Sequence, residues 1–182
     1  MRIISGARRG QKLIEFDGQN IRPTTDRVRE SLFNLIQEHI YGAKVLDLFA
    51  GSGALAFEAL SRGAKAAVLT DISADSVRVI EENRARLNFG DAVEVIRCSA
   101  EEYIKRTAEK FDIIFLDPPY NKGFILPIIA GILEENILAE SGIIVLESDS
   151  IDDHGEIDGL SVVKERKYGR TFVTIYKRGD NL

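Results

Sequence analysis

The hydrophobic pattern of this chain changes character near residue 44. Before that point, Val28, Leu32, Leu35, Ile36 and Ile40 recur at helical spacing, so they predict one amphipathic helix that starts after the candidate N-cap residues 24–26. After it, apolar residues form short continuous runs, as expected for buried strands. These predicted strands lie at 45–49, 66–70, 93–96, 112–116 and 143–146.

Helical segments separate the runs, at about 54–62, 74–88, 100–108 and 124–138. Strands that alternate with helices predict a mostly parallel sheet with helices on both faces, which is an α/β, Rossmann-like fold. The segments 160–165 and 172–176 flank a turn and predict an antiparallel hairpin near one edge, which gives a mixed sheet of seven strands. Residues 1–16 predict a separate small hairpin. We therefore expect an N-terminal extension over 1–42 and a main domain over 43–182.

The distribution of charge suggests a nucleic-acid partner despite a net charge of −5 over 182 residues. Residues 1–30 contain seven basic and four acidic side chains, a balance of +3 that leaves −8 for the rest of the chain. A basic docking surface on an acidic catalytic body would produce this asymmetry. A solvated charged face is the alternative.

Other features point to the cytoplasm and to chemistry without a metal. The single cysteine, Cys98, lies in an apolar stretch, so we expect a structural thiol and no intrachain disulfide. No apolar run is long enough to cross a bilayer, and the first residues lack the apolar core of a signal peptide. His39 and His154 have no neighbours with metal-ligand spacing. Nothing marks an oligomer interface, so we expect a monomer.

The first predicted strand leads into Asp47-Leu48-Phe49-Ala50-Gly51-Ser52-Gly53, a glycine turn at the edge of the sheet where α/β proteins bind ligands. Asp71, at the end of the second strand, could accept both hydroxyls of a ribose. The glycine spacing also fits a nicotinamide dinucleotide. Asp47 favours S-adenosylmethionine instead, because a carboxylate there repels a pyrophosphate and attracts a sulfonium and an ammonium.

The fourth strand ends in Asp117-Pro118-Pro119-Tyr120. A proline-rich turn with a capping aspartate is one interpretation. The other is catalytic: the Asp117 carboxylate and the Pro118 carbonyl accept the two N–H groups of an exocyclic amine, so that its lone pair points at the methyl group. The prolines would fix these acceptors, and Tyr120 would stack on a base flipped out of its helix or loop. A carbon target would require a cysteine nucleophile, for which Cys98 is poorly placed.

Together these motifs resemble the RsmD-type bacterial 16S rRNA guanine-N2 methyltransferases. The resemblance spans the chain and rests on Arg22-Pro23-Thr24-Thr25-Asp26-Arg27-Val28-Arg29-Glu30-Ser31-Leu32-Phe33-Asn34, the loop at 47–55, the Asp-Pro-Pro-Tyr motif and Tyr168-Gly169-x-Thr171. It implies methylation of 16S rRNA within a 30S subunit or assembly intermediate. The implied cofactor contacts are Asp47, Phe49, Ala50, Gly51, Ser52, Gly53, Asp71, Ile72 and Ala100. The implied RNA contacts are Arg8, Arg9, Arg22, Thr24, Arg27, Arg29 and Tyr168, and Lys12 would add a phosphate contact.

The chain departs from the family pattern after the third strand, where Ser99-Ala100-Glu101 stands in place of an acid that meets the adenine amine. Either Glu101 or the backbone of Ala100 would serve there. Three other functions compete with the implied one. They are an adenine-N6 methyltransferase acting on rRNA or DNA, a nicotinamide-dependent oxidoreductase, and a non-catalytic RNA-binding or ribosome-assembly factor.

Overall fold

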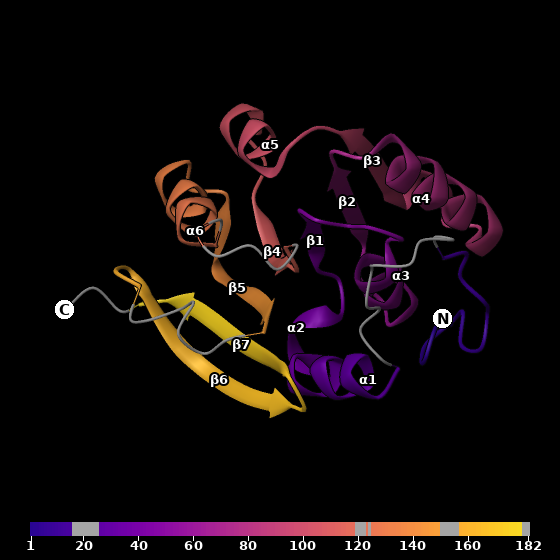
Figure 1. The fold of residues 1–182 in the computed structure, drawn as a ribbon, viewed down its shortest axis with the longest axis horizontal. Coiled ribbons are helices and arrows are strands. Elements are labelled where there is room, and N and C mark those ends of the chain that lie inside the picture. Colours follow the sequence, from indigo (N-terminus) through magenta and orange to yellow (C-terminus); the bar gives the residue numbers. More distant parts are fainter. Residues whose placement is uncertain (16–25, 119–122, 124, 150–156, 180–182) are drawn as a thin grey trace.

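The computed structural model describes residues 1–15, 26–118, 123, 125–149 and 157–179. In this part of the chain, seven strands form one sheet in the order β3-β2-β1-β4-β5-β7-β6 (Figure 1). The strands are β1 (Lys44–Asp47), β2 (Ala66–Asp71), β3 (Val93–Arg97), β4 (Phe111–Leu116), β5 (Leu138–Ser148), β6 (Leu160–Tyr168) and β7 (Thr171–Arg178). The first five are parallel, whereas β7 is antiparallel to both β5 and β6. This mixed α/β sheet confirms the predicted fold.

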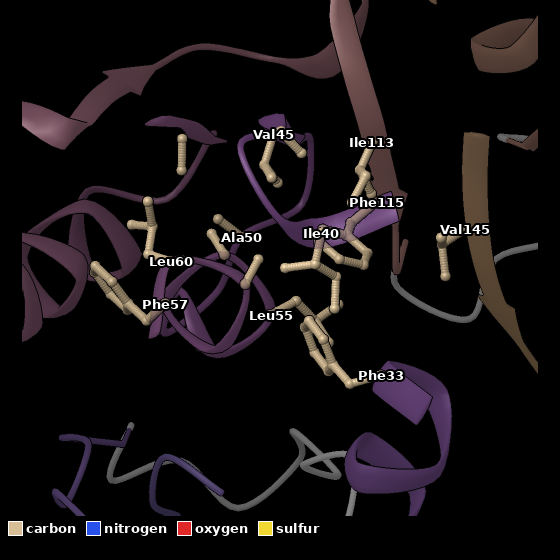
Figure 2. Packing of buried hydrophobic residues seen from close by; sticks show 14 of the residues in the cluster. Phe33, Ile40, Val45, Ala50, Leu55, Phe57, Leu60, Ile113, Phe115 and Val145 are labelled. Carbon is tan, nitrogen blue, oxygen red and sulfur yellow. The ribbon is translucent and has the colours of Figure 1, made fainter. Parts of the chain in front are cut away.

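Helices cover both faces of the sheet, each with its own apolar cluster. The helices are α1 (Asp26–Leu35), α2 (Gln37–Ile40), α3 (Ala54–Ser61), α4 (Ala74–Leu87), α5 (Ala100–Arg106) and α6 (Ile125–Glu134), with a 3-10 turn at Gly90–Ala92. Side chains from α1 to α4 pack on one face, and those from α5 and α6 pack on the other. Figure 2 shows the first cluster, in which the Phe33 and Phe115 rings lie 5.8 Å apart between their centroids.

The predicted ends of two helices are wrong, and local backbone conformation explains both. The helix expected through residue 40 is interrupted at Ile36, whose φ and ψ of −110° and 11° are not helical. The helix expected to reach residue 138 ends at Glu134, because Asn136 adopts a left-handed conformation with φ of 54°. The chain then joins β5 at Leu138, earlier than residue 143.

Residues 1–15 form the predicted N-terminal hairpin, here paired at Arg2 and Lys12. Ile3 and Leu13 are buried in the same apolar cluster as Val45 of β1. The hairpin also approaches α3 closely at Gly6, where φ is +82° and a Cβ atom would lie 1.8 Å from the Ser61 carbonyl oxygen. Only glycine fits there. The hairpin is therefore packed directly against the sheet domain.

Candidate active site

The glycine loop connects β1 to α3 and is shaped by its own backbone. The Ala50 N–H donates to the Thr70 carbonyl at 3.0 Å, and the Gly53 N–H donates to the Ala50 carbonyl at 2.6 Å. Gly53 has φ of +79°, and a Cβ there would lie 2.5 Å from a ring carbon of Phe57. Glycine is therefore required at this position, both by the positive φ and by the close packing of the loop against Phe57.

Asp71, at the end of β2, is fixed by two backbone donors. Its Oδ2 accepts from the Gly51 N–H and its Oδ1 from the Ser73 N–H, both at 2.9 Å. Each carboxylate oxygen keeps a further lone pair. The two backbone donors thus orient Asp71 beside the glycine loop and leave each oxygen able to accept one further hydrogen bond.

Asp47 has the opposite character, because part of its carboxylate has no partner. The residue is 1% exposed, and its Oδ1 makes no hydrogen bond. Burial and the negative charge of Asp71 raise the pKa of Asp47 to about 7, although the backbone amides of Ala56 and Phe49 oppose this shift. A cation beside Oδ1 would both pair with this atom and restore the ionised form. The site therefore fits the α-ammonium of S-adenosylmethionine.

Three buried polar side chains that the sequence analysis missed hold the N-terminal hairpin near this loop. Glu58 accepts from the Ile4 and Ser5 N–H groups at 2.7 and 3.0 Å, and Arg62 Nε donates to it at 2.7 Å. Ser61 accepts from the Arg8 N–H at 2.9 Å. Glu58 and Ser61 both lie on α3, where Glu58 is the single charged residue in an apolar segment. That contrast is the sequence signal that could have identified it.

Asn83 of α4 joins the hairpin to the glycine loop itself. Its Oδ1 accepts from the Ile14 N–H at 2.7 Å, and its Nδ2 donates to the carbonyls of Ile14 and Ser52, both at 3.0 Å. The side chain is fully buried. Asn83 thus fixes one carbonyl of the predicted cofactor loop to the N-terminal extension. An asparagine in the apolar stripe of Val79, Ile80 and Leu87 was the available signal.

Asp117 and Pro118 follow β4 directly, on the strand next to β1. Phe115 pairs with Asp47 across the two strands, and Asp117 lies two residues beyond this pair, just past the end of β4. Burial, and then the charges of Glu147 and Asp47, raise the pKa of Asp117 well above its ordinary value. Glu147 is itself buried near the end of β5. Pro119 and Tyr120 lie outside the described residues.

The remaining predicted cofactor residues surround the same strand ends. Phe49 is half-buried, and Ala50 and Ser52 are buried in the loop. Ile72, directly after Asp71, is 71% exposed, which leaves its side chain available to a ligand. Ala100 is buried at the start of α5, where Ser99 caps the helix by accepting from the Glu102 N–H at 3.2 Å, and Glu101 is exposed. The backbone near Ala100 is the more enclosed of the two predicted adenine contacts.

The residues predicted to contact RNA fall into two groups, those that make contacts within the protein and those that are exposed. Arg29 is only 1% exposed and hydrogen-bonds to the Arg2 carbonyl and to Asp26, so the prediction that it contacts RNA is corrected to a packing role. Arg8 is half-buried, and its Nε donates to the Leu87 carbonyl at 2.7 Å. Arg9 and Arg27 are exposed. Tyr168 is half-buried against the first apolar cluster, and Arg22 and Thr24 lie outside the described residues.

Three further observations concern groups outside the loop. Cys98 is buried, and burial raises the pKa of its thiol, as for a structural cysteine. Among residues 1–15, 26–118, 123, 125–149 and 157–179, no group of three or more His, Cys, Asp or Glu residues is arranged to hold a metal ion. No helix in those ranges has the length and apolar character of a membrane span.

The chain is similar in sequence and in fold to known methyltransferases. Residues 1–177 match the family model described as conserved hypothetical protein 95. The chain is 37% identical to the ribosomal RNA small subunit methyltransferase D of Escherichia coli K12, with 98% of this chain and 90% of the relative covered. Against the Haemophilus influenzae protein of the same name, identity is 33% with 97% and 93% covered. An Escherichia coli structure described as "Putative methyltransferase yhhF" superimposes with a TM-score of 0.89 at 36% identity, with 98% of this chain and 97% of that one covered.

The fold and the glycine loop define a class I, S-adenosylmethionine-dependent methyltransferase. Within this class, the chain belongs to the conserved hypothetical protein 95 family, which includes the small-subunit methyltransferases D to which it is similar. The predicted family and cofactor are therefore confirmed, and the nicotinamide alternative is not supported.

Proposed function

We propose that this methyltransferase modifies the exocyclic N2 amine of a guanine in 16S rRNA, of the guanine-966 type. The substrate would be the cytoplasmic 30S subunit or an assembly intermediate. The relatives named for ribosomal RNA support the substrate class. The single observation that carries the chemistry is the position of Asp117, which follows β4 on the strand next to β1 and lies close enough to Asp47 for their charges to interact.

The cofactor's place follows from the two aspartates at the ends of β1 and β2. Asp47 would pair with its α-ammonium through the unpartnered Oδ1, and Asp71 would accept its ribose hydroxyls. When bound there, S-adenosylmethionine supplies an electrophilic methyl group on a sulfonium. The glycine loop, which Asn83 holds, would keep the methyl group near the C-terminal end of β4.

Asp117 and the Pro118 carbonyl would hold the target amine. A guanine N2 amine is a weak nucleophile because its lone pair is delocalised into the ring. Two acceptors, one for each N–H, would turn the lone pair out of the ring plane and toward the methyl carbon. As the N–C bond forms and the S–C bond breaks, the nitrogen gains positive charge and must lose a proton. The ionised Asp117 carboxylate accepts that proton in this scheme, and its raised pKa makes it a stronger base than an ordinary aspartate.

The test is transfer of labelled methyl groups to 30S subunits that lack their natural methylation, followed by nucleoside analysis. We expect label in N2-methylguanosine with the wild-type enzyme. Asp117→Ala should lower kcat by roughly 100-fold or more, because it removes an acceptor that acts in the transition state. Asp117→Asn should lose less, since its amide oxygen still accepts an N–H. Asp75→Asn, which changes an exposed carboxylate on α4, is the control and should be fully active.

Each other result has a definite reading. Label in N6-methyladenosine would keep the methyltransferase chemistry and replace guanine by adenine. Full activity of Asp117→Ala would remove Asp117 from the mechanism. Absence of transfer to both 30S subunits and free 16S rRNA, in an enzyme that binds S-adenosylhomocysteine, would refute the RNA substrate.

A further inference from the structure

The segment Lys164–Arg170 is the most basic stretch of the described C-terminal region. It contains four basic residues and one acid in seven positions, which gives +3 in a chain of net charge −5. The segment forms the end of β6 and the turn into β7. We call it the hairpin tip.

The hairpin tip lies at the same edge of the sheet as the candidate active site. Leu116 of β4 pairs with Leu146 of β5, and Ser148 of β5 pairs with Phe172 of β7. The turn before Thr171 therefore extends from the edge at which β4 and β5 end. Three strand spacings separate β4 from β6 in the sheet order, which is about 14 Å. In Figure 1 this end of β6 lies beside α1, where Lys164 Nζ donates to the Leu35 carbonyl at 3.0 Å.

Most of the charge at the tip is available to a partner. Arg166, Lys167 and Arg170 are exposed, and within the described residues none of them forms an ion pair with a carboxylate. Arg166 donates one hydrogen bond to the Glu165 carbonyl at 2.7 Å, which leaves most donors of its guanidinium unused. Lys167 Nζ lies 4.9 Å from the centroid of the Phe172 ring, which supports the ammonium without neutralising it.

The charges also surround the tip rather than covering one face. Arg166 pairs with Val173 and Lys167 pairs with Phe172, so their side chains point to opposite faces of the two-stranded ribbon. Arg170 lies in the turn between the strands. A ridge that is positive on both sides and at its end matches phosphate groups on either side of it.

We propose that the hairpin tip binds the phosphate backbone of the substrate RNA next to the target nucleotide, through Arg166, Lys167 and Arg170. This inference rests on the proposed RNA substrate and adds a second contact surface to the N-terminal one. The tip would position RNA without reading its sequence, because phosphate contacts carry no base information. Bases that flank the flipped guanine would then lie between the tip and the N-terminal hairpin.

The test compares two variants with the same change in charge. The first is Arg166→Gln with Lys167→Gln and Arg170→Gln. The control is Lys65→Gln with Lys110→Gln and Lys177→Gln, which removes three exposed charges at the opposite edge of the sheet. Binding to unmethylated 30S subunits and to free 16S rRNA is measured over a range of salt concentrations. Thermal unfolding and affinity for S-adenosylhomocysteine are measured in parallel.

We expect the tip variant to bind RNA at least about tenfold more weakly near 0.1 M salt. The slope of log K against log salt should fall by about 2, as for the loss of three phosphate contacts. Its thermal midpoint and its affinity for S-adenosylhomocysteine should match those of the wild type. A tip variant whose RNA affinity and slope equal those of the control would overturn the proposal. A wild-type enzyme that neither methylates nor binds RNA would overturn the proposed function as well.

Discussion

The two basic ends of the chain carry the same balance of charge, +3 over residues 1–30 and +3 over 164–170, but the fold treats them differently. At the N-terminus, Arg29 is buried and Arg8 donates to carbonyls at the end of α4. At the hairpin tip, Arg166 and Arg170 are exposed without a carboxylate partner in the described structure. Charges at the hairpin tip are therefore accessible to an external partner, whereas Arg29 and Arg8 are engaged within the fold.

The same distinction separates the two aspartates of the proposed cofactor site. Asp71 is satisfied by two backbone N–H groups, whereas the buried Oδ1 of Asp47 has no partner. Replacing a group that the fold itself uses should lower stability. Replacing a group left for a ligand should impair binding and leave stability unchanged or higher. The following predictions test that division, beginning with the largest expected effect.

Glu58→Ala should cause the largest loss of stability, about 3–5 kcal/mol, because it leaves Arg62 and two partly buried backbone N–H groups without their acceptor. Urea unfolding followed by circular dichroism measures the effect. Glu58→Gln, which keeps one acceptor oxygen, should lose less, and Glu82→Ala on the exposed face of α4 should change stability little. A cost below about 1 kcal/mol for Glu58→Ala would show that the hairpin is not held by this residue.

Asn83→Ala should cost about 2–3 kcal/mol, since it removes three hydrogen bonds of a fully buried side chain. It should also weaken S-adenosylhomocysteine binding several-fold, because the Ser52 carbonyl in the glycine loop loses its donor. Calorimetric titration measures this affinity. Ser61→Ala is the matched control, since Ser61 anchors the hairpin without touching the loop. If both variants bind the ligand equally well, Asn83 supports the fold alone.

Asp47→Asn should stabilise the unliganded protein while impairing its function. The folded-state pKa of Asp47 is raised from 3.8 to about 7. Between those values the folded state binds more protons than the unfolded state, so the contribution of this carboxyl to stability falls as pH rises from 4 to 7. An asparagine avoids the buried charge, and we expect a gain of about 1–3 kcal/mol at neutral pH. A destabilised variant would mean that the carboxylate already has a favourable partner in the free protein.

The pH dependence of binding gives an independent readout of the same residue. Below about pH 7 the Asp47 carboxyl is protonated in the free enzyme and attracts a cation poorly. Below that value, the affinity for S-adenosylmethionine should therefore fall by up to about tenfold for each unit of pH. Asp47→Asn should bind more weakly at neutral pH and lose this dependence. Wild-type binding that is constant between pH 5 and 7 would contradict the role of Asp47.

The sequence was sufficient for the order of elements and for the placement of the candidate aspartates at strand ends. Asp47, Asp71 and Asp117 could be located because a parallel sheet brings the ends of its strands to one edge. Asn83 and Glu58 could not be assigned a contact, because each acts through partners far away in the sequence. Arg29 was assigned to RNA for the same reason, since its burial depends on how α1 packs against the N-terminal hairpin.

Arg8 and Arg9 allow engaged and exposed basic residues to be compared directly, because they are neighbours in sequence with different environments. Arg8→Gln should lower stability by about 1 kcal/mol, since the guanidinium donates to the Leu87 and Asn88 carbonyls at the end of α4. Arg9→Gln should change stability by less than about 0.5 kcal/mol, because the side chain is exposed. Arg9→Gln should instead reduce the salt dependence of RNA binding by about one phosphate contact. If Arg8→Gln, and not Arg9→Gln, reduced the salt dependence of RNA binding, RNA binding would release Arg8 from α4. The internal contacts of the N-terminal region would then themselves be part of the RNA-binding surface.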